Sequence, residues 1–348
     1  MERQLVFPQP GVVNLDSVAV GIVGPGMVRV RVEQSLISPG TELTAYSGRF
    51  NPDSHWGDYV RYPFYPGYSS AGRIVEIGEG IDKALTGSRV FTMWPHASGH
   101  ILPANAAFPI PDAVALEQAN WCALAGVAYV AICRASPAPG ESLAIIGAGP
   151  VGQMVVRWAA ISGAGRILVV DPVPNRLNLA KAGGASHVIP VTVESALPNL
   201  LDANSGKRPP VVIDATGCSA TLAEALPLVA DFGRLVLVGD VGNPAEQHLT
   251  SDVIARGVQI IGAHGNYMPY VLGQQHLAAR ETLPDNQVLE ERVRGWRAFS
   301  ELFHDAVLRG RFPLEAMTSH TFPIADVAEA YAMLSTRRTE SMGVALVW

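Results

Sequence analysis

Residues 143–171 constrain the fold of this chain more than any other stretch, because they alternate strand, glycine turn, helix and strand. An apolar run leads into Gly147-x-Gly149-x-x-Gly152, and a helical stretch and a second strand follow, ending on Asp171. Gly147 permits a tight turn, Gly149 lets the backbone approach a pyrophosphate, and Gly152 allows close packing of helix on strand. The complete order of elements predicts a dinucleotide site.

The residues around this turn favour one class of dinucleotide. Pro150 lacks an N–H and suits the first helical turn, where free amides and the helix dipole attract phosphate oxygens. Asp171 lies about 20 residues beyond the glycines, where a carboxylate accepts the hydroxyls of an adenosine ribose. An acid there repels a 2′-phosphate, which favours NAD(H), while the nearby Arg176 leaves NADP(H) as the alternative. The predicted cofactor-binding residues are Gly147, Gly149, Pro150, Val151, Gly152, Asp171, Arg176, Thr216 and Gly239.

Composition excludes several classes of partner. A net charge of −6 without basic clusters argues against nucleic acid. No apolar run reaches the roughly 20 residues that span a bilayer, and the first residues do not resemble a signal peptide. Cys122, Cys133 and Cys218 are isolated, as buried thiols in a reducing compartment would be. We therefore expect a cytoplasmic protein with neither a membrane nor a nucleic-acid partner.

The pattern along the chain predicts two domains, which 348 residues are enough to build. The first 110 residues contain short alternating segments separated by Gly/Pro turns, which indicates β-structure. Strands then alternate with helices, which indicates a parallel sheet covered on both faces. We assign residues 1–118 with 297–348 to a β-rich domain and 119–296 to a nucleotide-binding domain. The strands expected in the second part are Ile167–Val170, His187–Pro190, Val211–Asp214, Arg234–Val238 and Gln259–Ile261.

Several segments together resemble the medium-chain dehydrogenase/reductase superfamily, which includes the zinc-type alcohol dehydrogenases. Residues 37–48, 66–72 and 124–126 are similar to the segments that carry that family's three catalytic metal ligands. Residues 214–217, like the glycine turn, are similar to further family landmarks. The resemblance covers nearly the whole chain. It implies an α/β fold, with a GroES-like β-rich catalytic domain and a Rossmann domain built on a doubly wound parallel sheet.

The chain departs from this family at the metal ligands. Pro39, Tyr68 with Ser69, and Gly126 stand where the family has Cys, His (often followed by Glu), and Cys or Asp. Proline and glycine side chains offer no donor atom, and the family's four-cysteine structural zinc lobe is also missing. We therefore expect no zinc. A pair formed by His96 and His100 could ligate a metal if helical, but the flanking sequence indicates strand and turn.

Without a metal, protein hydroxyls must polarise the substrate oxygen, or the substrate must need little activation. The resemblance implies four candidate catalytic residues. Tyr68 occupies the position of a lost ligand, and Thr41 matches the family's relay hydroxyl. Glu42 matches an acid near the metal, and Thr44 stands where a relay histidine often sits. Three of them also have a structural explanation: Tyr68 could fill vacated volume, Thr41 could contact a ribose, and Glu42 could pair with a backbone amide.

These features favour a zinc-independent oxidoreductase that moves hydride between NAD(H) and a secondary alcohol or ketone. The pattern resembles the zinc-less branch that includes bacteriochlorophyllide hydroxyethyl dehydrogenase. The substrate stays open among aromatic, cyclic and sugar-like compounds. The alternatives are an NADPH-dependent quinone or enoyl (C=C) reductase and a non-catalytic nucleotide-binding protein. The resemblance also implies a homodimer paired through the strand near Gln259. Residues 265–296 could be a surface excursion or a substrate-contacting lid.

Overall fold

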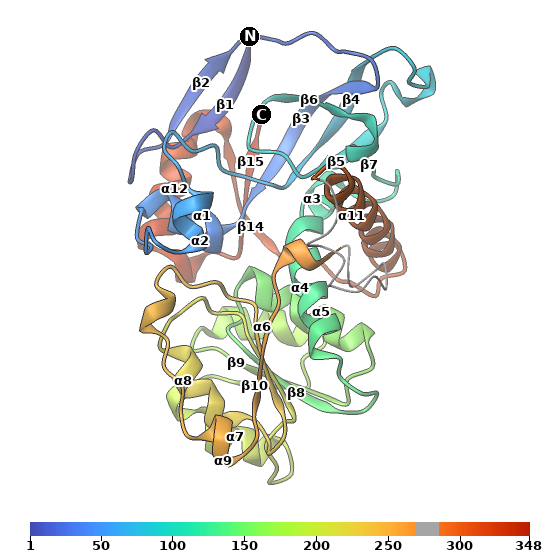
Figure 1. Cartoon of the computed structure of the whole chain (residues 1–348). Coiled ribbons are helices and arrows are strands. Elements are labelled where there is room, and N and C mark those ends of the chain that lie inside the picture. Colours follow the sequence, from blue (N-terminus) through green and yellow to red (C-terminus); the bar gives the residue numbers. More distant parts are fainter. Residues whose placement is uncertain (269–284) are drawn as a thin grey trace. The chain divides into compact units, whose positions relative to one another are not determined.

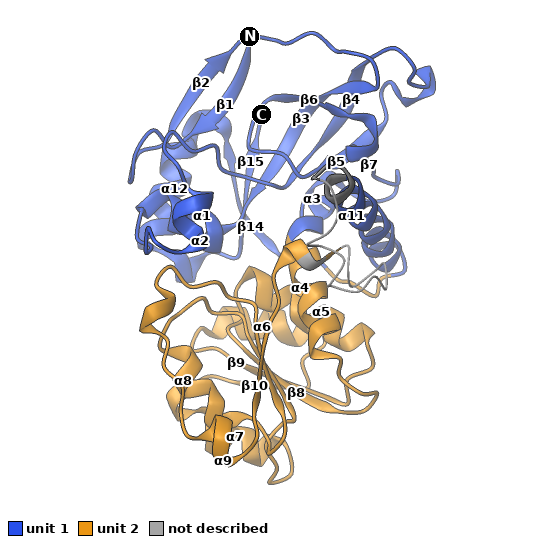
Figure 2. Cartoon of the chain, viewed as in Figure 1, with its two compact units in different colours: residues 1–123, 278–309, 314–348 blue, residues 124–277, 310–313 orange. Residues whose placement is uncertain are grey.

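The computed structural model describes residues 1–268 and 285–348, which fall into two compact units (Figure 2). Unit 1 comprises Met1–Ala123, Ala278–Arg309 and Leu314–Trp348, and unit 2 comprises Leu124–Leu277 and Gly310–Pro313. The bounds of these two units follow from how compactly the chain packs, not from function. Our assignment of functional domains, 1–118 with 297–348 and 119–296, stays a proposal. Of the proposed lid at 265–296, residues 269–284 lie outside the described residues.

Unit 2 is built on a six-stranded sheet in the order β10-β9-β8-β11-β12-β13, in which every neighbouring pair is parallel. The strands are β8 (Ser142–Ile146), β9 (Arg166–Val170), β10 (His187–Ile189), β11 (Val211–Asp214), β12 (Arg234–Leu237) and β13 (Gln259–Gly262). Both faces of the central strands are buried, because Ile145 and Ile146, neighbours on β8 that point to opposite faces, have no exposed surface. This explains the continuous apolar runs in the sequence.

Helices cover both faces of this sheet, and Figure 1 shows α7, α8 and α9 on one side with α4 and α5 on the other. The helices are α4 (Cys122–Ala135), α5 (Pro150–Ile161), α6 (Pro174–Ala182), α7 (Ala196–Ala203), α8 (Thr221–Ala225) and α9 (Asp252–Ala255). Leu200 of α7 and Leu222 of α8 pack with Ile146 and Val170 in one apolar cluster. Burying a leucine of this kind stabilises the fold by roughly 1.5–3 kcal/mol.

Unit 1 is β-rich, as expected from the alternating segments of its sequence. Its main sheet has the order β14-β15-β3-β4-β5-β7, with β6 paired to β3, and a separate hairpin joins β1 and β2. On β3 the buried Val28, Val30 and Val32 alternate with Arg29 and Arg31, the period-two pattern of a half-buried strand. The strands are β1 (Glu2–Val6), β2 (Asn14–Val18), β3 (Met27–Ile37), β4 (Ser70–Ile77), β5 (Arg89–Thr92), β6 (Gly99–Pro103), β7 (Phe108–Pro109), β14 (Thr318–Pro323) and β15 (Gly343–Val347).

Helices from both ends of the chain pack beside this sheet. They are α1 (Pro39–Ser47), α2 (His55–Tyr59), α3 (Leu116–Ala119), α11 (Asp285–Leu308) and α12 (Val327–Thr336). Ala45 of α1, Trp56 of α2 and Tyr331 of α12 share one buried cluster with Phe7 and Leu346. This cluster fixes α1 against α12, which matters because α1 carries three of the four predicted catalytic residues. The α/β fold, with a mixed sheet and a parallel Rossmann-like sheet, confirms the predicted fold class.

Candidate functional site

The glycine-rich turn of unit 2 has a tight backbone that explains two of its three glycines. Gly147 has a φ of +86°, and a Cβ there would lie 2.9 Å from Cγ2 of Thr216. A Cβ on Gly152 would lie 1.9 Å from the carbonyl oxygen of Gly147. A side chain at Gly152 would therefore displace backbone, and one at Gly147 would be strained by its positive φ and would press on Thr216. At Gly149, by contrast, a Cβ would meet nothing within 4 Å, so open space lies in front of this part of the turn.

Helix α5 begins at this open space. Gly149 is its N-cap and supplies no side-chain cap, and Pro150 follows in the first turn. The positive end of the α5 dipole therefore faces the turn without a side chain that neutralises it. Open space, a glycine backbone and a helix start at one place fit the pyrophosphate of a dinucleotide.

Asp171 follows β9 directly, is buried, and is hydrogen-bonded to the glycine turn. The Ala148 amide donates to its Oδ2 and the Val173 amide to its Oδ1, both at 2.8 Å. Nη1 of Arg176 lies 3.7 Å from Oδ2. Each carboxylate oxygen can accept a second hydrogen bond, so Asp171 keeps capacity for a ribose hydroxyl. The position fits the adenosine end of the cofactor.

The remaining predicted cofactor residues follow β11 and β12. Oδ1 of Asp214 accepts hydrogen bonds from the Thr216 amide at 2.9 Å and from Oγ1 of Thr216 at 2.7 Å. A Cβ on Gly239 would lie 2.2 Å from the backbone nitrogen of Gly217. Gly147 lies against Thr216, and the Ala148 amide donates to Asp171. These residues follow β8, β9, β11 and β12 and form one continuous surface at the carboxyl ends of the four strands. Parallel sheets of this kind bind nucleotides at that edge.

Asp214 lies under this surface and makes the stability of unit 2 depend on pH. Burial raises the pKa of its carboxyl to about 6, against the hydrogen bonds from Thr216 that lower it. Between pH 4 and 6 the folded chain thus holds a proton that the unfolded chain lacks, so stability falls as pH rises through this window.

We expect Asp214→Asn to stabilise the protein by about 1–3 kcal/mol at pH 8, because the amide oxygen still accepts from Thr216 without a buried charge. The gain should fade toward pH 4, where the wild-type carboxyl is protonated in the fold. Thermal melting of both proteins at pH 4.5 and pH 8 measures it. A variant that melts lower than wild type at pH 8 would show that the charge is needed.

In unit 1, three hydroxyls form a chain at the start of α1. The Tyr68 phenol donates to Oγ of Ser38, and Tyr68 also has a side-chain hydrogen bond with Thr41. Burial raises the pKa of Tyr68, opposed by these two hydrogen bonds and reinforced by the charge of Glu42. The phenol therefore stays protonated at neutral pH, as a donor to a substrate oxygen must be. Tyr68 and Thr41, predicted separately, are brought together here.

Glu42 is 1% exposed and lies directly behind this hydroxyl cluster of Ser38, Thr41 and Tyr68. Its Oε1 accepts the Ser38 amide at 2.7 Å, and its Oε2 lies 3.1 Å from Nε2 of His96 and accepts the Tyr331 hydroxyl. Burial and the charge of Glu42 raise the pKa of Tyr331 well above its usual value, so its hydroxyl remains a donor. A buried carboxylate with three donors is well compensated.

Thr44, the fourth predicted catalytic residue, has a different local partner. Its Oγ1 donates to the Gly40 carbonyl at 3.0 Å, one turn back along α1. This is the usual local bond of a helical threonine. A catalytic role for Thr44 stays a proposal.

Sequence reasoning did not select Ser38, His96 or Tyr331 as parts of this site. Ser38 lies inside the segment that carried the family resemblance, so its hydroxyl could have been noted. His96 was considered only as a metal ligand. Tyr331 is 289 residues from Glu42 along the chain, and only the tertiary fold brings the two together.

The side chains at the expected metal position do not fit zinc. Pro39 has no donor atom, the Tyr68 phenol is bonded to Ser38, and Oγ of Ser69 donates to the Asn120 carbonyl at 2.5 Å. The nearest strong ligands, Glu42 and His96, are bonded to each other. In residues 1–268 and 285–348 no group of three His, Cys, Asp or Glu side chains is arranged to hold a metal ion. We derive no step through zinc.

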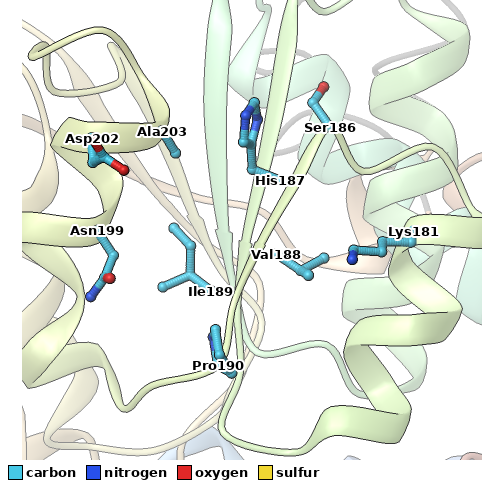
Figure 3. A pocket seen from close by; sticks show the side chains of 9 residues that line it. All are labelled: Lys181, Ser186, His187, Val188, Ile189, Pro190, Asn199, Asp202 and Ala203. Atoms are coloured by element: carbon cyan, nitrogen blue, oxygen red, sulfur yellow. The ribbon is translucent and has the colours of Figure 1, made fainter.

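A surface pocket of about 410 Å³ lies elsewhere on unit 2, between α6, β10 and α7 (Figure 3). The residues that line it include Lys181, His187, Asn199 and Asp202. None of the predicted site residues lines this pocket. The pocket is therefore separate from the nucleotide surface. Across the described parts of the chain, no helix is long and apolar enough to cross a membrane.

Comparisons with known proteins find similarity to dehydrogenases. Residues 150–275 match the family model described as zinc-binding dehydrogenase. Sorbitol dehydrogenase of Bacillus subtilis (strain 168) is 29% identical over 266 residues, covering 67% of this chain and 70% of that protein. L-Threonine 3-dehydrogenase of Pyrococcus furiosus is 25% identical over 279 residues, covering 70% and 77%. By these matches the chain is similar to zinc-type alcohol dehydrogenases of the medium-chain dehydrogenase family.

Solved structures show the same fold over the whole chain. An Escherichia coli oxidoreductase/dehydrogenase of unknown specificity superposes with a TM-score of 0.80 at 19% identity, covering 99% of both chains. An alcohol dehydrogenase from E. coli CFT073 in complex with NADH has a TM-score of 0.77 at 20% identity, covering 100% of this chain and 99% of that one. These likenesses show the fold of the chain.

Proposed function

We propose that this chain transfers hydride between NAD(H) and a secondary alcohol or ketone without a metal ion. The observation that carries the proposal is the hydroxyl cluster of Ser38, Thr41 and Tyr68, backed by the carboxylate of Glu42, at the position where the family resemblance places the metal. The cofactor, when bound, supplies or accepts the hydride.

The residues of unit 1 would handle the substrate oxygen. During reduction Tyr68 would turn its single hydroxyl proton from Ser38 to that oxygen, with the Ser38 hydroxyl donating to the phenol in return, and so offset the negative charge that develops on the substrate oxygen. In the opposite direction the phenol would first release its proton to solvent, and the phenolate would then accept the alcohol proton. Ser38 and Thr41 would donate hydrogen bonds that stabilise this phenolate. Glu42 holds the backbone of Ser38 and keeps the phenol protonated. We keep Thr44 as a candidate for passing the proton to solvent.

In unit 2, we propose that Gly147, Gly149, Pro150, Val151 and Gly152 hold the pyrophosphate. Asp171 would accept the adenosine ribose hydroxyls, with Arg176 beside it, and Thr216 and Gly239 would line the rest of the surface. Because Asp171 already accepts two amides and lies beside Arg176, it is well fixed for this role. The names of the relatives direct the substrate search toward sugar alcohols and amino alcohols, beside aromatic and cyclic alcohols.

We further propose a cytoplasmic homodimer. Its support is β13, which lies at the edge of its sheet, and the apolar side chains around that edge. Ile254 and Phe232, on segments next to β13, are 92% and 83% exposed. A free strand edge flanked by exposed apolar side chains suits pairing across a two-fold axis.

The direct test is a comparison of NADH with NADPH. We expect NADH to bind at least about tenfold more tightly, because the Asp171 carboxylate accepts a ribose hydroxyl but repels a 2′-phosphate. Fluorescence titration gives both dissociation constants, and a panel of secondary alcohols, ketones, quinones and enones gives the reaction. Tighter NADPH binding with reduction of quinones or enones would support the alternative reductase. Cofactor binding without turnover of any compound would support a non-catalytic protein.

A further inference from the structure

His96 contacts the two segments that carry the hydroxyl cluster, and it has no role in the chemistry proposed above. Its ring is fully buried. A Cβ on Gly67 would lie 2.6 Å from the ring atoms Cγ and Cδ2, so the ring packs flat against the residue before Tyr68. The His96 amide also donates to the Pro66 carbonyl at 2.8 Å. The segment 66–68, which carries Tyr68, thus packs against His96 and is hydrogen-bonded to it.

The other side of the ring reaches helix α1. Nε2 lies 3.1 Å from Oε2 of Glu42, and Oε1 of Glu42 accepts the Ser38 amide at 2.7 Å. Oγ of Ser38 in turn accepts the Tyr68 phenol. A closed loop of contacts therefore runs from His96 through Glu42 and Ser38 to Tyr68, and back to His96 through Gly67.

Hydrogen-bond accounting identifies Nε2 of the ring as a donor. The Trp348 indole can only donate, and it donates to Oγ of Ser35 at 3.0 Å. Oγ of Ser35 lies 2.9 Å from Nδ1 of His96, so its own proton is free to point at Nδ1. Oε2 of Glu42 can only accept, so Nε2, at 3.1 Å, carries a proton and donates it to Glu42. This assignment gives each of the four side chains a partner.

We infer that His96 is the positioning residue of the hydroxyl cluster: through Glu42 and Gly67 it holds the Tyr68 phenol at the place where a substrate oxygen would meet it. This inference rests on the proposed function for its catalytic consequence. The structural part, the control of Tyr68 by His96, stands on contacts within unit 1. A displacement of about 1 Å at such a group can lower a rate about 100-fold.

Three variants separate this role from general packing. His96→Gln places an amide N–H near the position of Nε2 and keeps a donor for Glu42. His96→Asn keeps a polar atom near Ser35 and loses the Glu42 contact. Ser35→Ala is the matched control, because it removes a buried hydrogen bond at the other end of the same chain. Should His96→Asn not fold, His96→Phe fills the ring volume without a donor.

The first readout needs no substrate. Protein labelled with ¹³Cζ-tyrosine gives one NMR signal for each of its nine tyrosines, and Tyr68→Phe assigns that of Tyr68. We expect His96→Asn to shift the Tyr68 signal, and His96→Gln and Ser35→Ala to leave it near its wild-type position. An unchanged Tyr68 signal in His96→Asn, or equal shifts in all three variants, would overturn the inference.

The second readout is kcat for any alcohol or ketone that the enzyme turns over. We expect His96→Asn to lower kcat about 10- to 100-fold with KM and NADH affinity little changed, and His96→Gln to restore most of it. In the double variant with Tyr68→Phe, the loss should be no greater than with Tyr68→Phe alone, because His96 acts through Tyr68. Multiplied losses would overturn the inference. A normal kcat in Tyr68→Phe would instead overturn the proposed function, while the NMR result would still test the positioning.

Discussion

Tyr68→Phe is expected to lower kcat by about 10²- to 10³-fold, the loss measured when one hydrogen-bond donor to a developing oxyanion is removed. The Tyr68 phenol is the group of the hydroxyl cluster that we propose as donor to the substrate oxygen. Burial raises the pKa of this phenol, so it keeps its proton. KM should change little, because the hydrogen bond strengthens mainly as charge develops on the oxygen, and NADH affinity should change little, because the proposed cofactor residues lie on unit 2. Steady-state kinetics with the best substrate of the panel, together with NADH titration, measures these three quantities.

The matched control is Tyr46→Phe. Tyr46 lies on α1 as well, and its hydroxyl donates to the Gly11 carbonyl at 2.8 Å, away from the cluster. Removing that hydroxyl costs one hydrogen bond of comparable kind, about 1 kcal/mol of stability, and should leave kcat within about twofold. If Tyr68→Phe kept wild-type kcat, or both variants lost the same factor, Tyr68 would be a packing residue that fills the volume of the missing ligand.

Gly149→Val is expected to weaken NADH binding by about 100-fold or more with only a small loss of melting temperature from the less favourable N-cap residue. The free protein has room for the side chain, because a Cβ at Gly149 meets nothing within 4 Å and its φ of −69° is ordinary. The same side chain would occupy the space in front of α5 that the pyrophosphate needs. A 100-fold loss corresponds to about 2.7 kcal/mol of binding free energy. Fluorescence titration and thermal melting measure the two effects separately.

Substitutions at two other glycines serve as controls for this result. Gly24→Val adds a side chain at a turn of unit 1 where a Cβ also meets nothing within 4 Å, and should leave both quantities unchanged. Gly152→Ala should lower the melting temperature, because its Cβ would lie 1.9 Å from a backbone oxygen. Wild-type NADH affinity in Gly149→Val would mean that the cofactor does not cross the turn at this point.

The sequence was sufficient to predict the nucleotide half of the fold, because that information is local. The strand after Gly165 and the helix after Gly149 carry their own periodicity and end signals, and β9, β11 and β12 agree with the expected strands to within one residue. The order of these elements then places Gly147, Asp171 and Thr216 at one edge of a parallel sheet by topology alone.

The catalytic half could be predicted only in part, because its geometry depends on distant segments. Tyr68 and Thr41 were found through the family resemblance. The partners of Glu42 were not, since His96 comes from a loop before β6 and Tyr331 from α12. No local pattern shows that a carboxylate is bound by groups so far apart in sequence. The same limit applies to Asp214, whose pKa is raised by burial that only the folded chain creates.

The most direct test of the account is the activity of metal-depleted protein. The chain is dialysed against a strong chelator, its metal content is measured by mass spectrometry, and kcat with NAD(H) is compared before and after. We predict that kcat stays the same at less than about 0.05 metal ions per chain and that added zinc does not raise it, since protein hydroxyls would stabilise the oxygen in place of a metal ion. Loss of turnover on depletion, with recovery on stoichiometric zinc, would contradict the account.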